Sequence, residues 1–297
     1  MKSAQLFHNP AAGEGDHSKK GLLEIIEAAG FNCSYSSTKE DGWEKISEDK
    51  IDFVIVAGGD GTVRKVAEEL LDKKVLDKKF PIAIIPSGTA NNIGNTLRLP
   101  KNVEAIAARW KNETLLQFDV GKITNVKGAK FFLEGLGYGV FPELIKAMKK
   151  RSKEEETPEL ELQKALSLLH DIVLFYKGKP ARIAIDEKEY VDHYLLIEVM
   201  NIKSVGPNLD LAPQADPGDG ELEVILIPES QREKLARYIH CHLMNDNEDI
   251  SFETIKAKKV SIEWQGHFCH ADDQLLEINK GEEISIELLE GALQFMV

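Results

Sequence analysis

The sequence predicts an α/β domain with a parallel sheet and flanking helices, followed by a mainly antiparallel, β-sandwich-like domain. Strand and helix patterns alternate through the first third of the chain, which is typical of βαβ units. Two strands in that part are dense apolar runs, as expected for strands buried on both faces. After about residue 112, strand patterns follow one another with few helices. A length of 297 residues is sufficient for two domains, each with a core of its own.

The first domain opens with a strand pattern and then alternates. The run at 51–57 is rich in Ile, Val and Ala, and the run at 81–86 is similar, so both are expected to be buried strands. A helix pattern ends at Gly30, because glycine readily takes the left-handed conformation that closes helices. The expected elements are strands at 2–8, 31–38, 51–57 and 81–86, and helices at 19–29, 62–72 and 103–111. This order predicts a parallel sheet with helices on both sides.

Strand patterns dominate the second domain and are interrupted by helices. The expected strands are 115–123, 131–137, 181–185, 194–201, 222–227, 260–264 and 284–289, and the main helices are 162–175 and 232–242. We therefore expect one domain at 1–118 and a second at 119–289. The last residues, from about 290 to 297, are expected to return to the first domain.

Composition narrows the class of protein. The formal net charge of −13 argues against binding to nucleic acid. Cys33, Cys241 and Cys269 are widely spaced and form no CxxC pair, which disfavours a disulfide framework and is typical of a reducing compartment. No apolar run reaches the ~18 residues that a membrane span needs, and the N-terminus lacks a signal-peptide pattern. We expect a cytoplasmic protein.

Three glycine-bearing loops each follow a predicted strand of the first domain, at residues 8–15, 58–62 and 86–92. Open α/β sheets bind ligands at the carboxyl ends of their strands. Glycines let backbone N–H groups approach a phosphate, and the start of the next helix favours negative charge. The sequence Gly-Gly-Asp-Gly-Thr at 58–62 therefore predicts a phosphate-binding loop. The alternative is a tight turn in which Asp60 or Thr62 caps a helix.

Acidic residues add a second kind of chemistry. Asp60 would repel a phosphate directly, so we interpret it as a magnesium-linked or proton-handling group. Asp216, Asp219 and Glu221 lie in a turn before a predicted strand, where oxygen ligands for a hard cation can converge. The alternative for these three residues is an acidic turn in solvent. A further acidic stretch lies at 271–274, between strands.

The motifs together resemble one family. Asn9-Pro10, the loop at 58–62 and the Ser-Gly-Thr-Ala-Asn-Asn run at 87–92 have the order and spacing of the diacylglycerol kinase catalytic domain. The C-terminal half also fits the pattern of this family, at Asn201, Gly206, Leu211-Ala212-Pro213 and Asp219-Gly220. The chain thus resembles, over nearly its whole length, the diacylglycerol kinase family, which includes sphingosine and ceramide kinases. The resemblance implies an N-terminal domain like that of NAD kinases and diacylglycerol kinases, with ATP in the cleft between the two domains.

The resemblance also implies the role of single residues. It predicts transfer of the γ-phosphoryl group of ATP to a hydroxyl of a diacylglycerol-like or related lipid. Nucleotide contacts are expected at Asn9, Thr38, Gly58, Gly59, Asp60, Gly61, Thr62, Arg64, Gly88, Thr89 and Asn91. Magnesium is expected at Asp216, Asp219 and Glu221, the acceptor near Asp119, and catalytic roles at Asp60, Asp272 and Gln274. A lipid or other alcohol acceptor, transient contact with a membrane surface and a homodimer are the expected partners.

Three positions depart from the family pattern. Gln274 stands where the family carries a Glu proposed as general base, and Gln cannot accept a proton, so we expect impaired activity with Asp60 or Asp272 as substitutes. Asn92 and Arg64 stand where Asp and Asn are usual. Two alternatives therefore stay open. One is a soluble kinase like NAD kinase, which shares the Gly-Gly-Asp-Gly loop, and the other is a nucleotide- or lipid-binding relative with weak or no catalysis.

Overall fold

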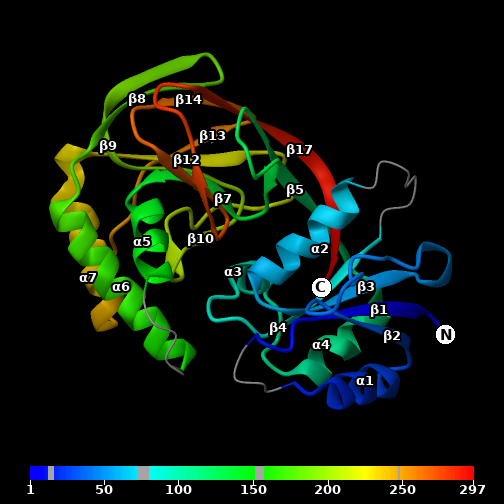
Figure 1. Ribbon diagram of the computed structural model, residues 1–297. Helices are drawn as coiled ribbons and strands as arrows, with labels where there is room; N and C mark the ends of the chain where they lie inside the picture. The colour runs from blue at the N-terminus through cyan, green and yellow to red at the C-terminus, as the bar shows by residue number, and fades with distance from the viewer. Residues whose placement is uncertain (13–16, 73–79, 151–156, 247) are drawn as a thin grey trace. The chain divides into compact units, whose positions relative to one another are not determined.

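The chain forms two compact units in the computed structural model (Figure 1). The structure describes residues 1–12, 17–72, 80–150, 157–246 and 248–297. One unit comprises Met1–Phe118 together with Gly291–Val297, and the other comprises Asp119–Glu290. The last strand, β17 (Glu283–Met296), begins in the second unit and ends in the first.

The first unit is built on a parallel sheet in the order β4-β3-β1-β2. Its strands are β1 (Ser3–His8), β2 (Asn32–Ser37), β3 (Phe53–Gly58) and β4 (Ile82–Pro86). The end of β17 adds a further parallel strand beside β4, with Phe295 opposite Ile82. Residues 53–58 of β3 are all buried, as their apolar composition predicts for a central strand.

Helices cover both faces of this sheet (Figure 1). They are α1 (Lys19–Ala28), α2 (Asp60–Asp72), the short α3 (Asn92–Thr96) and α4 (Val103–Arg109), with 3-10 turns at Glu48–Lys50 and Trp110–Asn112. Side chains of α1 and α4, among them Ile26 and Ile106, pack with Leu6, Ile55 and Ala83 of the sheet. The α2 helix lies on the other face. The carboxyl ends of the strands are thereby left to loops.

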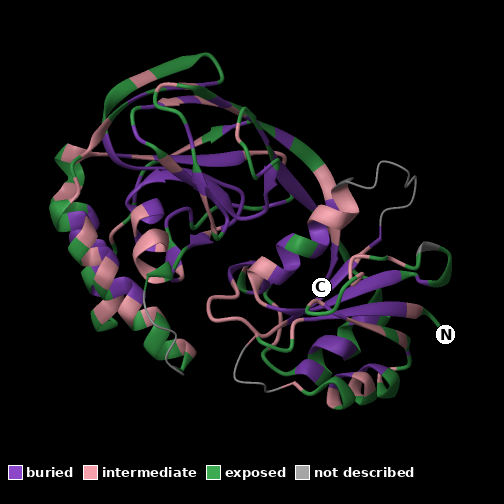
Figure 2. Ribbon diagram, in the orientation of Figure 1, coloured by how far each residue is buried: buried purple, intermediate pink, exposed green. Residues whose placement is uncertain are grey.

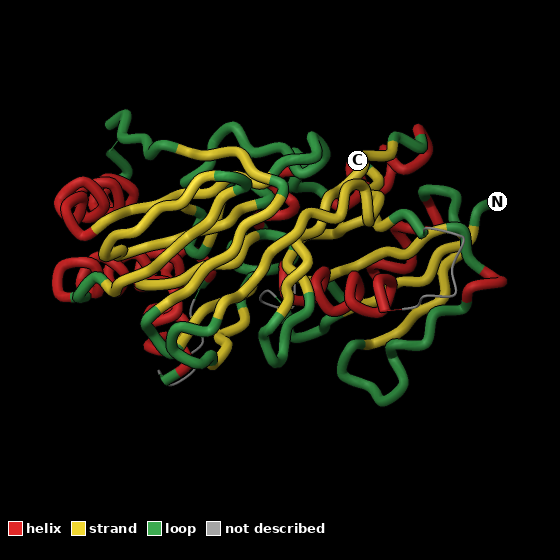
Figure 3. Tube along the Cα trace, turned by 90° about the horizontal axis from the view of Figure 1, so that it is seen from above, coloured by secondary structure: helices red, strands yellow, loops and turns green. Residues whose placement is uncertain are grey.

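The second unit is antiparallel in all the strand pairs that the structure describes there. Its strands are β5 (Leu115–Thr124, which starts in the first unit), β6 (Phe131–Phe132), β7 (Gly135–Gly139), β8 (Lys179–Ile185), β9 (Lys188–Met200), β10 (Ser204–Val205), β11 (Leu209–Asp210), β12 (Leu222–Pro228), β13 (Thr254–Ala257), β14 (Lys259–Trp264), β15 (Phe268–Ala271), β16 (Gln274–Glu277) and the start of β17. Strand β9 is central: its first half pairs with β8, and its second half pairs with β7 and β12. Figure 3 shows these long strands side by side.

Two apolar clusters hold this unit together. One is formed mainly by side chains of the strands, including Tyr138, Ile197 and Trp264. The other lies under the helices α5 (Val140–Lys149), α6 (Pro158–Phe175) and α7 (Arg232–Met244). Buried and exposed residues alternate along α6 and α7, while β7 and the second half of β9 are buried throughout (Figure 2). These helices are therefore amphipathic, with one face on the sheet.

The architecture confirms the predicted fold class, an N-terminal α/β domain with parallel strands and a C-terminal antiparallel β-sandwich-like domain. Local differences have simple causes. The five-residue α3 is too short to show a helical period, and α5 starts directly after the glycine-rich strand β7. The single strand expected at 131–137 is broken into β6 and β7. Strands β15 and β16 form a hairpin around the acidic stretch at 271–274.

Candidate functional site

The β3–α2 loop (58–62) leads from the end of β3 directly into α2. The Thr62 amide donates to the Gly59 carbonyl at 2.8 Å, which closes the turn. A Cβ atom on Gly58 would lie 2.5 Å from Thr62 Oγ1, and one on Gly59 would lie 2.9 Å from Gly88 Cα, so neither position has room for a side chain. Glycine at these positions therefore lets the loop pack directly against Thr62 and against the backbone at Gly88.

The β4–α3 loop (86–92) touches the β3–α2 loop through backbone atoms. The Ser87 amide donates to the Gly58 carbonyl at 3.1 Å, and a Cβ on Gly88 would lie 2.5 Å from a Cα of the neighbouring loop. Asn91 adopts a left-handed φ of 52° and fixes the loop with its own side chain. Its Oδ1 accepts from the Gly88 amide at 2.8 Å, and its Nδ2 donates to the Gly88 carbonyl at 2.6 Å. The two loops thus form one continuous backbone surface, with Thr89 within it.

Asp60 ties the two loops together. Its carboxylate accepts hydrogen bonds from the backbone amides of Asn92, at 2.9 Å, and Ile93, at 3.1 Å. These amides belong to the first turn of α3, whose N–H groups have no partner within the helix. Asp60 therefore caps α3, although it lies in the first turn of α2. The sequence analysis considered Asp60 as a helix cap, and the helix that it caps is α3.

The remaining predicted nucleotide contacts lie around the same edge of the sheet. Asn9 Nδ2 donates to Thr62 Oγ1 at 3.3 Å, and Asn9 Oδ1 accepts from the Ala11 amide at 3.2 Å. The Thr38 amide donates to the His8 carbonyl, which places Thr38 just after β2. Arg64 lies one turn further along α2, where it is 2% exposed and 3.7 Å from the Glu68 carboxylate. The glycines at 13 and 15 of the first loop lie outside the described residues.

The second unit holds the predicted cation ligands in one acidic turn, which comprises Asp216, Asp219 and Glu221. Asp216 Oδ1 accepts from the Gly218 amide at 3.0 Å, and Asp219 Oδ1 accepts from the Glu221 amide at 3.0 Å. The ammonium of Lys256 reaches both Asp219 Oδ2, at 3.1 Å, and Glu221 Oε2, at 2.6 Å. These two carboxylates raise the pKa of Lys256 well above its usual value, chiefly through the Glu221 hydrogen bond.

Glu223 is a fourth acidic residue beside this turn that the sequence pattern did not single out. It is 1% exposed, and neither carboxylate oxygen has a hydrogen-bond partner. Burial, followed by the negative charge of Asp219, raises the pKa of Glu223 to about 7. The signal in the sequence was a Glu at a buried position of the apolar run at 222–227.

Asp119, the predicted acceptor contact, is buried and holds the acidic turn in place. Its Oδ2 accepts from the Gly220 amide at 2.8 Å, and its own amide donates to the Pro217 carbonyl. The Asn201 side chain donates to the Asp119 carbonyl at 2.8 Å. The motif residues Asp119, Asn201 and Asp219-Gly220 are thus brought together within the second unit.

Asp272 occupies the β15–β16 turn with a left-handed φ of 53°. Its carboxylate accepts from three successive backbone amides, those of Leu133, Glu134 and Gly135, at distances of 2.8 to 3.3 Å. The half-buried Gln274 follows as the first residue of β16, opposite Ala271. Asp272 is therefore an anchor between the hairpin and the start of β7.

A buried pair behind this turn escaped the sequence analysis. His270 Nε2 lies 2.8 Å from Glu198 Oε1, and both side chains are at most 1% exposed. His270 Nδ1 lies 2.9 Å from the Asp272 carbonyl and must donate to it, so one proton is shared between Nε2 and the carboxyl. Burial raises the pKa of Glu198. Burial also acts to lower the pKa of His270, but the charge and hydrogen bond of Glu198 outweigh it and leave that pKa raised. A lone Glu within the apolar run at 194–200 was the signal that could have revealed it.

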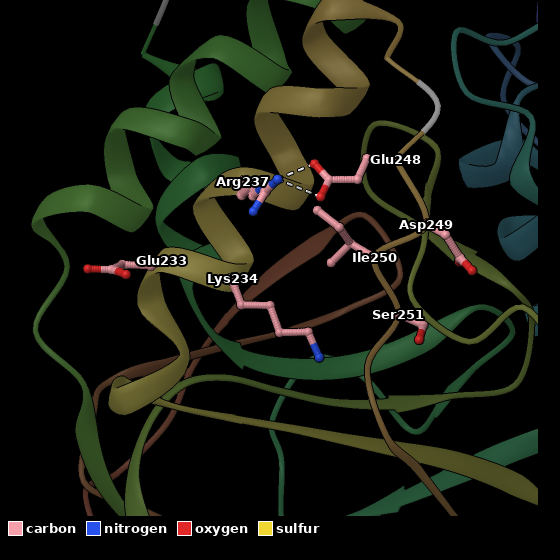
Figure 4. A pocket seen from close by; sticks show the side chains of 7 residues that line it. All are labelled: Glu233, Lys234, Arg237, Glu248, Asp249, Ile250 and Ser251. Atoms are coloured by element: carbon pink, nitrogen blue, oxygen red, sulfur yellow. Dashed lines mark hydrogen bonds and ion pairs between the residues drawn. The ribbon is translucent and has the colours of Figure 1, made fainter.

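A shallow hollow on the surface of α7 belongs to neither group of residues (Figure 4). Lys234, Arg237, Glu248 and Ile250 are among its lining residues. Arg237 and Glu248 pair across it at 2.7 Å. It contains none of the predicted nucleotide, cation or acceptor residues, so it is not a candidate for the chemistry considered above.

Both domains of the chain match domains of known protein families. Residues 3–123 match the diacylglycerol kinase catalytic domain, and residues 146–289 match the YegS C-terminal NAD kinase beta sandwich-like domain. These matches confirm, in both domains, the predicted resemblance to the diacylglycerol kinase family. The two matches follow one another along the chain, as the predicted two-domain order requires.

Relatives within this family resemble the chain over most of its length. The diacylglycerol kinase of Staphylococcus haemolyticus is 24% identical over 272 residues, which are 88% of this chain and 78% of the relative. That of Staphylococcus carnosus is 26% identical and covers 88% and 84%. The crystal structure of a diacylglycerol kinase from Bacillus anthracis str. Sterne has a TM-score of 0.74 at 26% identity and covers 99% and 96%.

Proposed function

We propose that this chain is an ATP-dependent kinase that transfers the γ-phosphoryl group to a hydroxyl of a diacylglycerol-like lipid. The observation that carries the proposal is the backbone surface formed by the β3–α2 and β4–α3 loops, in which Gly58, Gly59 and Gly88 have no room for side chains. The relatives are named for phosphorylation of diacylglycerol, which supports a lipid acceptor. The proposal includes a cytoplasmic protein that meets its acceptor at a membrane surface. Among the residues described, no helix is both long and apolar enough to span a membrane.

The loops would act by positioning and by charge. Phosphoryl transfer needs the acceptor oxygen in line with the γ-phosphorus, while the bond to the ADP oxygen breaks. Backbone amides of the β3–α2 loop and the start of α2 would donate to phosphate oxygens, with Asn9 and Thr62 beside them. Asp60 would keep the β4–α3 loop in register with its neighbour by capping α3. When bound, a magnesium ion supplies positive charge that offsets the charge on the phosphates.

The acidic turn does not form a ready cation site. Asp216, Asp219 and Glu221 are hard oxygen ligands, but among the described residues no group of three His, Cys, Asp or Glu side chains could hold a metal ion as they stand. Lys256 instead pairs with Asp219 and Glu221, and Asp119 holds the turn through the Gly220 amide.

Among the described residues that the sequence assigned to catalysis, none is a free strong base for the proton of the acceptor hydroxyl. Gln274 cannot take it, and the carboxylates of Asp60 and Asp272 both accept backbone hydrogen bonds. These contacts favour positioning roles for the two aspartates. Because the transition state of phosphoryl transfer is loose, the proton can leave late, and loss of a base commonly lowers the rate ~10²–10⁴-fold without abolishing it. We therefore propose a slow kinase.

The test is incubation of the purified chain with radiolabelled ATP and extracted lipids, followed by identification of the labelled product. A labelled phospholipid that forms only with the folded protein supports the proposal. NAD is supplied in a parallel reaction, and labelled NADP there would favour the NAD kinase-like alternative instead.

A second candidate is a relative that binds nucleotide or lipid with little catalysis, which Gln274 and the engaged aspartates favour. ATP binding by calorimetry without turnover on any lipid or soluble alcohol would support this candidate over the kinase.

A further inference from the structure

The buried pair of Glu198 and His270 lies in one row with Gly137 across three neighbouring strands. Gly137 of β7 is opposite Glu198 of β9 on one side and opposite His270 of β15 on the other. A Cβ atom on Gly137 would overlap the Glu198 carboxylate, so the glycine leaves the space in which the two outer side chains meet. His270 Nε2 and Glu198 Oε1 are 2.8 Å apart in this space. The register of the sheet and one glycine therefore build the pair.

Burial keeps one proton between these two side chains. An unpaired charge at this depth would be costly, because His270 and Glu198 are both at most 1% exposed. Two other titratable side chains that interact with Glu198, those of Tyr138 and Cys269, have pKa values raised by burial and carry no charge near neutral pH. Whether the shared proton is on Nε2 or on the carboxyl, His270 Nδ1 keeps a proton of its own, since it donates to the Asp272 carbonyl at 2.9 Å.

The bond from Nδ1 fixes the peptide that leads into β16. The Asp272 amide donates to the Gly135 carbonyl at 2.8 Å, and the Asp272 carboxylate accepts from amides at the start of β7. His270 adds the bond to the carbonyl, the group that links Asp272 to the next residue. Two residues further along, Gln274 begins β16 opposite Ala271. The direction of the Asp272 carbonyl therefore affects where the Gln274 side chain lies.

We propose that His270 is a positioning residue, which holds the β15–β16 turn and with it Gln274 through Nδ1–H, while Glu198 keeps the imidazole in place. The inference rests on the proposed function, because Gln274 occupies the position that the family pattern assigns to a general base. His270 acts through the turn: its buried imidazole donates to a backbone carbonyl and takes no proton from the acceptor. Glu198 acts one step further back, through His270.

Two substitutions at His270 separate its two hydrogen bonds. The side-chain amide of His270→Asn lies near the place of Nδ1 and can still donate to the Asp272 carbonyl, whereas that of His270→Gln lies near the place of Nε2 and reaches only Glu198. Both remove the ring, whose centroid lies 5.9 Å from that of Phe141. Asn leaves more empty space than Gln, so lost packing alone would make His270→Asn the more harmful change.

The first readout is hydrogen exchange of the Leu133, Glu134 and Gly135 amides, which donate to the Asp272 carboxylate. We expect about tenfold faster exchange in His270→Gln and nearly wild-type exchange in His270→Asn. The second readout is steady-state phosphoryl transfer. Because a small misplacement of a site residue is costly, we expect His270→Gln to lower kcat about tenfold with little change in the KM for ATP, and His270→Asn to recover most of that loss.

A third measurement needs only the wild type. NMR of the His270 ring nitrogens should show a proton on Nδ1 throughout the range from about pH 5 to pH 8. His193→Gln, which changes an exposed histidine of β9, is the matched control and should behave like the wild type in all three measurements.

An Nδ1 without a proton would overturn the inference, as would a His270→Asn variant that exchanges its amides and turns over as poorly as His270→Gln or worse. If the wild type transfers no phosphoryl group, the proposed function fails, and the amide exchange and the NMR signal still decide whether His270 holds the turn.

Discussion

Replacement of Asp60 by Ala tests the assembly of the phosphate surface. The carboxylate of Asp60 accepts from the Asn92 and Ile93 amides at 2.9 and 3.1 Å, and those two residues are 2% and 1% exposed. Leaving buried donors unsatisfied costs about 1–3 kcal/mol, and loss of a helix cap alone costs about 0.5–2 kcal/mol. We therefore expect Asp60→Ala to lower the free energy of unfolding by about 1–3 kcal/mol and to abolish phosphorylation.

The assay is urea unfolding together with the rate of phosphoryl transfer under folding conditions. Asp60→Asn keeps one acceptor oxygen and should recover part of the stability. Asp52→Ala is a matched control, because Asp52 also accepts a backbone hydrogen bond, from Ser3 at 2.8 Å, but lies on the exposed surface away from the glycine loops. Unchanged stability in Asp60→Ala, or near-normal activity in it, would refute the reasoning.

Three further predictions concern single positions. Gln274→Glu should raise the transfer rate if a general base is what the chain lacks, and an equal or lower rate removes that explanation. Gly88→Ala would place a Cβ 2.5 Å from Gly59 Cα and should weaken ATP binding measured by calorimetry, whereas Gly21→Ala in α1, where the nearest heavy atom is 3.3 Å away, should not. Because the pKa of Glu223 is raised from 4.5 to about 7, the folded state holds a proton that the unfolded state releases, so stability falls as pH rises through this interval. Glu223→Gln should flatten that fall in urea unfolding between pH 5 and pH 8, and an unchanged slope would contradict the assignment.

The parts of the site that local patterns encode could be predicted from the sequence. Glycines after apolar strands located the β3–α2 and β4–α3 loops, because strand ends and helix starts are signalled within a few residues. Partners far apart along the chain could not be predicted in the same way. Asp60 meets the Asn92 amide 32 residues away, and Glu198 meets His270 72 residues away. Such contacts depend on strand order and register, which hydrophobic periodicity does not determine.

The pairing of Lys256 with the acidic turn could not be predicted from the sequence for the same reason. Nothing in its neighbourhood marks it as a partner of Asp219, 37 residues earlier, until the pairing of β12 with β13 sets them side by side. The acidic turn alone indicated a cation site, and the register added a cation that the protein itself supplies.

The central claim is tested most directly by the rate at which label passes from radiolabelled ATP to defined diacylglycerol in mixed micelles. The account predicts a labelled phospholipid product from the wild type and none from Asp60→Ala, with Asp52→Ala as active as the wild type. Calorimetric binding of ATP to a folded wild type that labels neither diacylglycerol nor any other lipid alcohol would contradict the account.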